Sequence, residues 1–503
     1  MPSSGVRLRL FLTCWILYSL HFATDFVREH YLVLGIVEHQ SYALDDYYGL
    51  HVDIFQNPPN APVQGAHHGA NPGISMVAAM PYALFRPAVD WVVNRELASR
   101  ADRADTAVVY RDDRPRRVEF YHRIRERGLD IRFALVSAIT QTFCMAPLSA
   151  ASVVLLFSLF AHLGLGTRTS LGMSLLYAFG TPVFFRTGYL NQNLAIGLFS
   201  LAAFVLLWNP NGFSAWSPRR RHLIAGALGG LSFLCDYSGA IPMGLLGLYA
   251  WWKQTEERGP GDGFRLAVWY AAGCLPGMLL LAQYQYASFG NPFYPPQHWM
   301  APVEWIDVGY QGVGGLSTEL VWLLLADPRY GLLLTMPMTL LALAAPWFAR
   351  TEGSPVPLRE ALVCLVLSAS LVLFFGTVQY TRLQWVTGIR YLAAVLPFIF
   401  LAAVPVLLRL PRAVVWAIGM LSVTIAWSMS MVRSQGTVFD NIQQVFIEGF
   451  QLPWLTVLGK LSAQYAPWLK HGVSPLPLFL LTGALVWLVW KLERPGNRLD
   501  RTR

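Results

Sequence analysis

Four aspartates close to the N-terminus have types and spacing suited to chemistry at a membrane surface. Asp25 follows the first apolar run of the chain directly, and Asp45, Asp46 and Asp53 lie in the segment YALDDYYGLHVD. A carboxylate held there can take a proton from an acceptor hydroxyl or bind a metal ion. We predict that Asp25 is the catalytic base, with Asp45 or Asp46 as the alternative. We predict that Asp53 binds one of the two substrates, either the molecule that donates a group or the molecule that accepts it. Each acid could instead be solvated or cap a helix.

Other polar residues follow or precede apolar runs farther along the chain. His67 and His68 stand between glycines in QGAHHGANPGIS, Arg186 lies in GTPVFFRTGYLNQN, Asp236 in LCDYSG and Arg390 in GIRY. Arginine is permanently charged and binds phosphate oxygens through two parallel hydrogen bonds. We therefore predict that these residues bind donor or acceptor, with Arg390 and Arg186 on a phosphate. The alternative for each arginine is that its side chain reaches out to lipid headgroups.

No cofactor is firmly predicted, and a divalent metal stays an open alternative. The adjacent side chains of His67 and His68 diverge and would chelate one ion poorly, but one of them could hold a metal together with His51 and the acids. The five cysteines all fall inside apolar stretches without metal-type spacing, which predicts free buried thiols. The sequence contains no P-loop, no GxSxG and no HExxH motif.

The composition indicates which kind of fold must position these residues. Of the 503 residues, 54% are hydrophobic and only 13% are charged, about half the charged fraction of a soluble protein. This excludes a soluble enzyme, a disordered scaffold and a secreted disulfide module, and it predicts an all-α integral membrane protein. The net charge of +9 does not indicate nucleic-acid binding, because the basic residues cluster between apolar runs.

Apolar runs long enough to cross a bilayer predict about 12 transmembrane helices. The candidate spans are 8–24, 133–163, 170–187, 193–208, 222–236, 239–252, 266–284, 331–349, 358–378, 391–409, 413–432 and 475–491. Residues 1–24 form an uncleaved signal anchor in this interpretation, and residues 133–491 form a multi-span domain.

The distribution of Lys and Arg predicts the orientation. Basic clusters occupy alternate connections and the tail 492–503, so the positive-inside rule places both termini in the cytoplasm. A bacterial inner membrane, with the site facing the periplasm, is the predicted location. If residues 73–93 crossed the membrane, every later loop would change sides and the basic clusters would face outward. We therefore predict that residues 73–93 form an amphipathic helix in the outer interface.

A large extracytoplasmic loop, 25–132, follows the first span in this topology. We predict that its segment REHYLVLGIVEH forms a helix along the interface, because apolar residues at helical spacing are flanked by charges. Further outer loops are predicted at 285–330, 379–390 and 433–474. We predict that residues 318–326 form a second interfacial helix.

This layout and several short motifs resemble the GT-C superfamily of membrane glycosyltransferases, which includes protein O-mannosyltransferases and the lipid A aminoarabinose transferase. The motifs that carry the resemblance are Asp25-x-x-x-Glu29-x-Tyr31, Asn71-Pro72-Gly73-Ile74-Ser75, Gly180-Thr181-Pro182 and Gly388-Ile389-Arg390-Tyr391 through Pro397-Phe398. The chain departs from the family pattern in two places. The usual acidic pair after the first span is Asp25-Phe26, and the His67-His68 region replaces a lysine that often precedes the prolines.

The resemblance implies that a sugar moves from a polyprenyl-phosphate carrier to a glycan, lipid or protein acceptor, with inversion at the anomeric carbon. The lipid bilayer and the lipid-linked donor are then the partners, and nucleic acid is not. Three other functions remain open at this point: a secondary transporter, a polymerase or ligase of lipid-linked glycans, and a non-catalytic assembly factor. Transporters usually show repeated halves and midplane charges, whereas the charges here gather at one predicted boundary.

Overall fold

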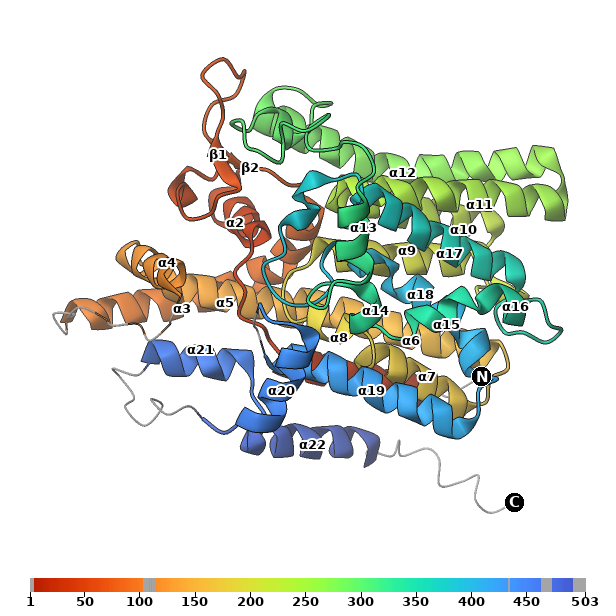
Figure 1. Ribbon diagram of the computed structural model, residues 1–503. Helices are drawn as coiled ribbons and strands as arrows, with labels where there is room; N and C mark the ends of the chain where they lie inside the picture. The colour runs from red at the N-terminus through yellow and green to blue at the C-terminus, as the bar shows by residue number, and fades with distance from the viewer. Residues whose placement is uncertain are drawn as a thin grey trace.

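The computed structural model describes residues 4–102, 108, 110, 112, 114–432, 435–462 and 473–491, and it is mostly helical (Figure 1). The first helices are α1 (Ser4–Leu20), α2 (Arg28–Leu34), α3 (Gly73–Asp102), α4 (Pro115–Glu126), α5 (Asp130–Thr140), α6 (Ala146–His162), α7 (Thr167–Phe179), α8 (Val183–Arg186), α9 (Gln192–Trp208), α10 (Pro218–Cys235) and α11 (Ala240–Arg258). The others are α12 (Pro260–Phe289), α13 (Thr318–Leu325), α14 (Leu332–Thr335), α15 (Thr339–Leu343), α16 (Ala345–Ala349), α17 (Leu358–Phe375), α18 (Leu396–Leu407), α19 (Arg412–Met431), α20 (Val438–Glu448), α21 (Pro453–Ser462) and α22 (Leu476–Lys491). Strands β1 (Ile54–Gln56) and β2 (Ala66–His68) pair antiparallel.

Within the part of the chain that the structure describes, four helical segments are long and apolar enough to cross a membrane: Asp130–His162, Pro260–Phe289, Leu358–Phe375 and Arg412–Met431. Shorter apolar helices cover Gln192–Trp208, Tyr391–Leu407 and Leu476–Lys491. Helices occupy the other predicted spans as well, so the apolar pattern predicted the positions of the helices. The number of helices that cross a bilayer stays a prediction.

The predicted span 331–349 is not one helix. It is divided into α14, α15 and α16. Pro337 and Pro346 lie in this run, and proline lacks the N–H group that continues a helical hydrogen-bond ladder.

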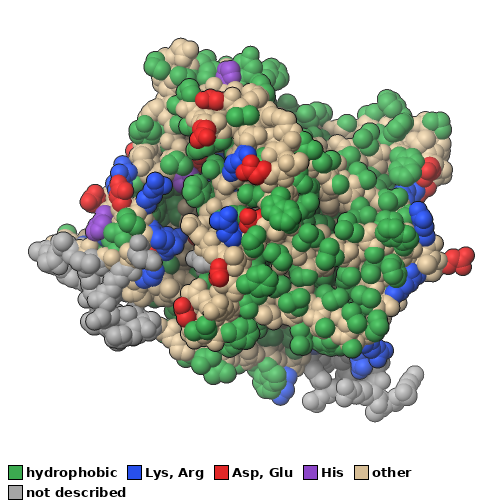
Figure 2. Space-filling view, viewed as in Figure 1, with side chains coloured by type: hydrophobic (Ala, Val, Ile, Leu, Met, Phe, Trp, Pro, Cys, Tyr) green, Lys and Arg blue, Asp and Glu red, His purple; other side chains and the backbone are tan. Residues whose placement is uncertain are grey.

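The helix ends that carry the basic clusters meet at one end of the bundle, which we call the basic end. Arg7 of α1 lines a small cavity together with His162 of α6 and Phe213, which follows α9. Lys253 of α11 donates to the carbonyl of Leu207 at the end of α9 (3.2 Å). Figure 2 shows that hydrophobic side chains cover most of the right half of the visible face, while charged ones lie on the left, in the middle and at the right edge.

The described residues between 25 and 132 pack onto the opposite end, which we call the site end. The amide of Asn71 donates to the carbonyl of Phe233 near the end of α10 (3.1 Å), and that of Asn57 donates to Ser288 in α12 (2.9 Å). The large loop is thus a folded cap on the bundle, with α2, β1 and β2 beside the end of α12 (Figure 1).

The predicted helix in REHYLVLGIVEH is present. It forms α2 and continues as a π-helix over Gly35–His39, and residues 29–35 are all buried within the protein. Its position along the membrane interface stays a prediction. Residues 73–93 are helical as predicted, but α3 extends to Asp102. The predicted helix at 318–326 is present as α13.

Helices α10 and α12 approach closely because glycines face each other. A Cβ added at Gly226 would lie 1.9 Å from the carbonyl oxygen of Tyr270, and one added at Gly277 would lie 2.4 Å from the backbone of Gly230. Small residues four apart allow two helix backbones to touch. This contact fixes the ends of α10 and α12 on which the cap packs.

We expect Gly226→Ala to lower the thermal stability of the purified protein clearly, because the new methyl group would displace the backbone of α12. Overpacking of this kind costs about 1–3 kcal/mol or more. The matched control is Gly244→Ala in α11, where an added Cβ meets nothing within 4 Å. Equal melting temperatures for the two variants would contradict the close packing.

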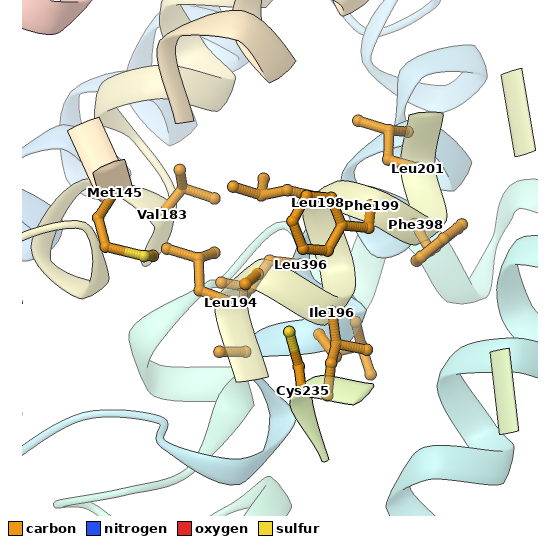
Figure 3. Close-up of a cluster of buried hydrophobic side chains, with 14 of the residues drawn as sticks. Met145, Val183, Leu194, Ile196, Leu198, Phe199, Leu201, Cys235, Leu396 and Phe398 are labelled. Atoms are coloured by element: carbon orange, nitrogen blue, oxygen red, sulfur yellow. The ribbon is translucent and has the colours of Figure 1, made fainter. Parts of the chain in front are cut away.

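The hydrophobic core surrounds α9, most of whose residues are buried. Figure 3 shows Leu194, Ile196 and Leu198 of α9 among side chains from other helices, including Cys235 at the end of α10 and Leu396 at the start of α18. The five cysteines are free and buried, which confirms the prediction from the sequence. The start of α9 is thereby held rigidly at the site end.

Candidate functional site

Arg28 at the start of α2 is the centre of a charge cluster at the site end. Its Nε lies 3.1 Å from Oε1 of Glu29, and its Nη1 lies 3.0 Å from Oδ2 of Asp53, just before β1. The Glu29 side chain is 8% exposed and that of Asp53 is 28% exposed. Of the two carboxylates bound by Arg28, Asp53 is therefore the one that a ligand can reach.

The charge of Asp53 is set by its neighbours. Burial alone would raise the pKa of this carboxyl, but the charge of Arg28, with smaller contributions from His51 and Arg390, lowers the pKa below its usual value of 3.8. The pKa of Glu29 is lowered in the same way by Arg28 against the opposing effect of burial. Both carboxylates are therefore ionised at neutral pH.

The two adjacent histidines of β2 point to opposite sides, as successive residues of a strand do. His67 faces the ring of Phe289, with 5.4 Å between ring centroids. His68 faces the charge cluster and interacts electrostatically with Arg28 and Glu29. Its Nδ1 accepts a hydrogen bond from the backbone N–H of Ala70 (3.2 Å). Of the two predicted ligand-binding histidines, only His68 is brought to Arg28.

We expect the stability of the protein to fall as the pH drops from 6.5 towards 4. Burial lowers the pKa of His68, and also of His30 in α2, to about 4. Below pH 6.5 the unfolded chain binds protons at these histidines that the folded chain excludes, so the free energy of unfolding decreases by roughly 1.4 kcal/mol per pH unit for each. Melting curves between pH 4.5 and 7.5 measure this, and His68→Gln should weaken the dependence. An identical pH dependence in the variant would contradict the buried neutral state.

Two arginines form a positively charged part of the site. Arg186 in α8 is 0% exposed, and its guanidinium donates to the carbonyl of Gly388 (2.6 Å) and to the hydroxyl of Tyr189. Arg390 donates to the carbonyl of Leu383 (2.6 Å) and is close enough to Arg186 for the two charges to repel. Among the described residues, neither guanidinium has a carboxylate within salt-bridge distance. Because burying an unpaired charge is costly, the buried Arg186, with the half-buried Arg390 near it, is suited to bind an anion.

Asp236 at the end of α10 completes the site. Its Oδ2 accepts a hydrogen bond from Nε2 of Gln192 at the start of α9 (2.9 Å), and its Oδ1 accepts one from the N–H of Ser238 (2.9 Å). The phenol of Tyr391 interacts electrostatically with Asp236, and also with Arg28, Arg390 and Asp53. Tyr391, at the start of η8 (Tyr391–Val395), therefore lies within electrostatic range of residues from α2, from the rest of the cap and from the end of α10.

The three acids that the sequence favours as the base have other contacts within the cap. Oδ1 of Asp45 accepts the backbone N–H of Ala66 (2.9 Å), which ties it to the hairpin. Asp46 is 72% exposed and lies 3.4 Å from His39. Asp25 is 17% exposed and lies 3.7 Å from Arg117.

Arg28, Glu29 and Tyr391 are site residues that sequence reasoning did not single out individually. The available signal was an Arg-Glu pair at the start of an apolar segment, since charges are buried only when they are paired. The described residues contain no group of three or more His, Cys, Asp or Glu side chains placed to hold a metal.

Comparison of the chain with protein-family models, with curated proteins and with solved structures finds no match. The function must therefore be argued from the chemistry of the site itself.

Proposed function

We propose that this protein is an integral membrane glycosyltransferase that moves a sugar from a polyprenyl-phosphate carrier to a hydroxyl acceptor outside the cytoplasm. The observation that carries the proposal is the pair Arg186 and Arg390, two arginines without carboxylate partners among the described residues, next to the carboxylates bound by Arg28. An anionic donor and a proton-accepting carboxylate are the two requirements of this reaction.

Asp53 is the residue that we propose as the catalytic base, with Asp25 as the alternative. Asp53 is ionised and partly exposed, and it is held by Arg28 within electrostatic reach of Arg390. In the transfer, the acceptor oxygen attacks the anomeric carbon from the side opposite the phosphate, and the bond from that carbon to the phosphate oxygen breaks. Asp53 takes the proton of the acceptor hydroxyl. Because its pKa is low, it takes the proton late, as the acceptor oxygen loses electron density to the sugar.

The arginines stabilise the leaving group. The polyprenyl phosphate gains negative charge as the sugar departs, and preorganised cations at that position lower the barrier. The buried position of Arg186 makes the stabilisation strong, since charges interact more strongly where water is excluded. Tyr189 and the backbone of Gly388 hold its guanidinium in place.

The arrangement of the bundle supports a site on the outer face. The predicted cytoplasmic residues Arg7, Lys253 and Arg359 lie at the basic end, whereas the cap and the charge cluster lie at the site end. With both termini in the cytoplasm, as the positive-inside rule predicts, the site faces the periplasm of a bacterial cell. The apolar exterior between the two ends would face lipid and the carrier tail.

The test is sugar transfer by the full-length protein in nanodiscs. Polyprenyl-phosphate donors with different radiolabelled sugars are supplied together with total envelope lipids and glycans as acceptors. We expect polyprenyl phosphate and a labelled product in equal amounts from at least one donor. If the same folded protein moves labelled donor across proteoliposome membranes without breaking the sugar–phosphate bond, it is a transporter and the proposal is wrong.

A further inference from the structure

Nε2 of His68 and Oε1 of Gln192 are buried polar atoms without a hydrogen-bond partner among the described residues. Gln192 donates to Asp236, and both Asp236 and His68 interact electrostatically with the pair Arg28 and Glu29. His68 is 0% exposed and Gln192 is 7% exposed. Folded proteins rarely leave such atoms unpaired, because removing them from water without a partner is unfavourable. At a binding site the missing partner is supplied by the ligand.

The hydrogen-bond roles of the two atoms follow from their neighbours. Nδ1 of His68 accepts the N–H of Ala70, so the neutral ring carries its proton on Nε2, which is a donor. The amide nitrogen of Gln192 donates to Asp236, so its Oε1 remains as an acceptor. Together with the carboxylate of Asp236, the site offers one donor and several acceptors. Hydroxyl groups, which donate and accept, match this set.

We propose that Asp236, Gln192 and His68 form the subsite that binds the hydroxyl groups of the transferred sugar. The inference rests on the proposed function and names the sugar class: the subsite accepts a neutral hexose and rejects a uronic acid. Rejection follows because both carboxyl oxygens of Asp236 act as acceptors. The carboxylate of a uronic acid also only accepts, so it would gain no hydrogen bond from Asp236 and would have to lose its water.

The chain connects this subsite directly to the two arginines. The segment from Arg186 to Gln192 ends at α9, and the hydroxyl of Tyr189 within it accepts from both Arg186 and Asn191, the latter at 3.2 Å. Arg186 thus lies on the phosphate side and Gln192 on the hydroxyl side of one short segment. A sugar phosphate matches this arrangement, because its ring hydroxyls lie close to the phosphate on the anomeric carbon.

The experiment compares binding of three probes to the full-length protein in nanodiscs: farnesyl phosphate, its esters with neutral hexoses, and its ester with glucuronic acid. We expect at least one hexose ester to bind more tightly than farnesyl phosphate, and the glucuronic acid ester to bind more weakly than that hexose ester. Gln192→Leu should reduce the preference for the hexose by about 2–10-fold, as expected for one lost hydrogen bond, and leave the affinity for farnesyl phosphate unchanged. Asp236→Asn should reduce the rejection of the uronic acid.

Gln254→Leu is the matched control. Gln254 is also a buried glutamine with an unpartnered Oε1, but it lies in α11 near the basic end. Its replacement should change none of the three affinities. Equal affinities of wild type for all probes, or an unchanged preference in both site variants, would overturn the subsite. Failure of the wild type to bind farnesyl phosphate would instead contradict the proposed function.

Discussion

Replacement of Asp53 by asparagine should reduce the turnover number of sugar transfer by about 10²–10⁴-fold, the range that general-base catalysis contributes. Asparagine keeps the size of the side chain and can still accept a hydrogen bond from Arg28, but it cannot take a proton from the acceptor. The Michaelis constant for the lipid donor should change little, because the donor phosphate binds at the arginines. Steady-state kinetics in nanodiscs measure both values.

Asp46→Asn is the control for this variant, since Asp46 is 72% exposed in the same cap and contacts His39. It should retain wild-type turnover. The low pKa of Asp53 also predicts that activity does not fall from titration of this residue as the pH decreases from 7 to 5. Full activity of Asp53→Asn together with loss in Asp25→Asn would move the base to Asp25.

Arg186→Met and Arg28→Met should change stability and activity in different ways. Arg28 binds Glu29 and Asp53, so its loss leaves two buried or partly buried carboxylates unpaired and should cost about 3–5 kcal/mol of stability. Arg186 is fully buried without a carboxylate partner among the described residues, so its replacement removes an uncompensated charge. We expect Arg186→Met not to lower the melting temperature, but to reduce kcat/KM by about 10²–10³-fold.

Thermal melting and donor kinetics on the same preparations measure these effects. A stable but inactive Arg186 variant is the signature of a residue kept for function at the expense of stability. If Arg186→Met unfolds as readily as Arg28→Met, Arg186 is a structural residue and the anion site loses its main support.

The positions of the helices could be predicted from the apolar pattern, because a helix that is buried or faces lipid requires a long run without charges. The apolar pattern did not indicate that residues 331–349 are divided into three helices. The run is apolar over its whole length, so it predicts one span in spite of its two prolines. The pattern also did not show that Arg28 and Glu29, at the start of α2, compensate each other's charge.

For the site, the sequence singled out residues at the ends of apolar runs, and Arg186, Arg390 and Asp236 are all at the site end of the bundle. Which carboxylate faces them depends on how the cap folds, and no local pattern specifies that. Asp45 and Asp53 are similar in sequence terms, yet the hairpin binds one through a backbone N–H and brings the other to Arg28. Contacts between distant segments, such as Gln192 with Asp236, are likewise invisible until the helices are packed.

The most direct test is an electron cryo-microscopy structure of the protein in nanodiscs with a farnesyl phosphate ester of the hexose that it transfers. The account predicts that the phosphate lies between Arg186 and Arg390, within hydrogen-bond distance of the unpartnered Nε of Arg186. The sugar should then lie towards Gln192. Density for the phosphate at the other end of the bundle, in the cavity of about 460 Å³ lined by Lys253 and Arg359, would contradict it.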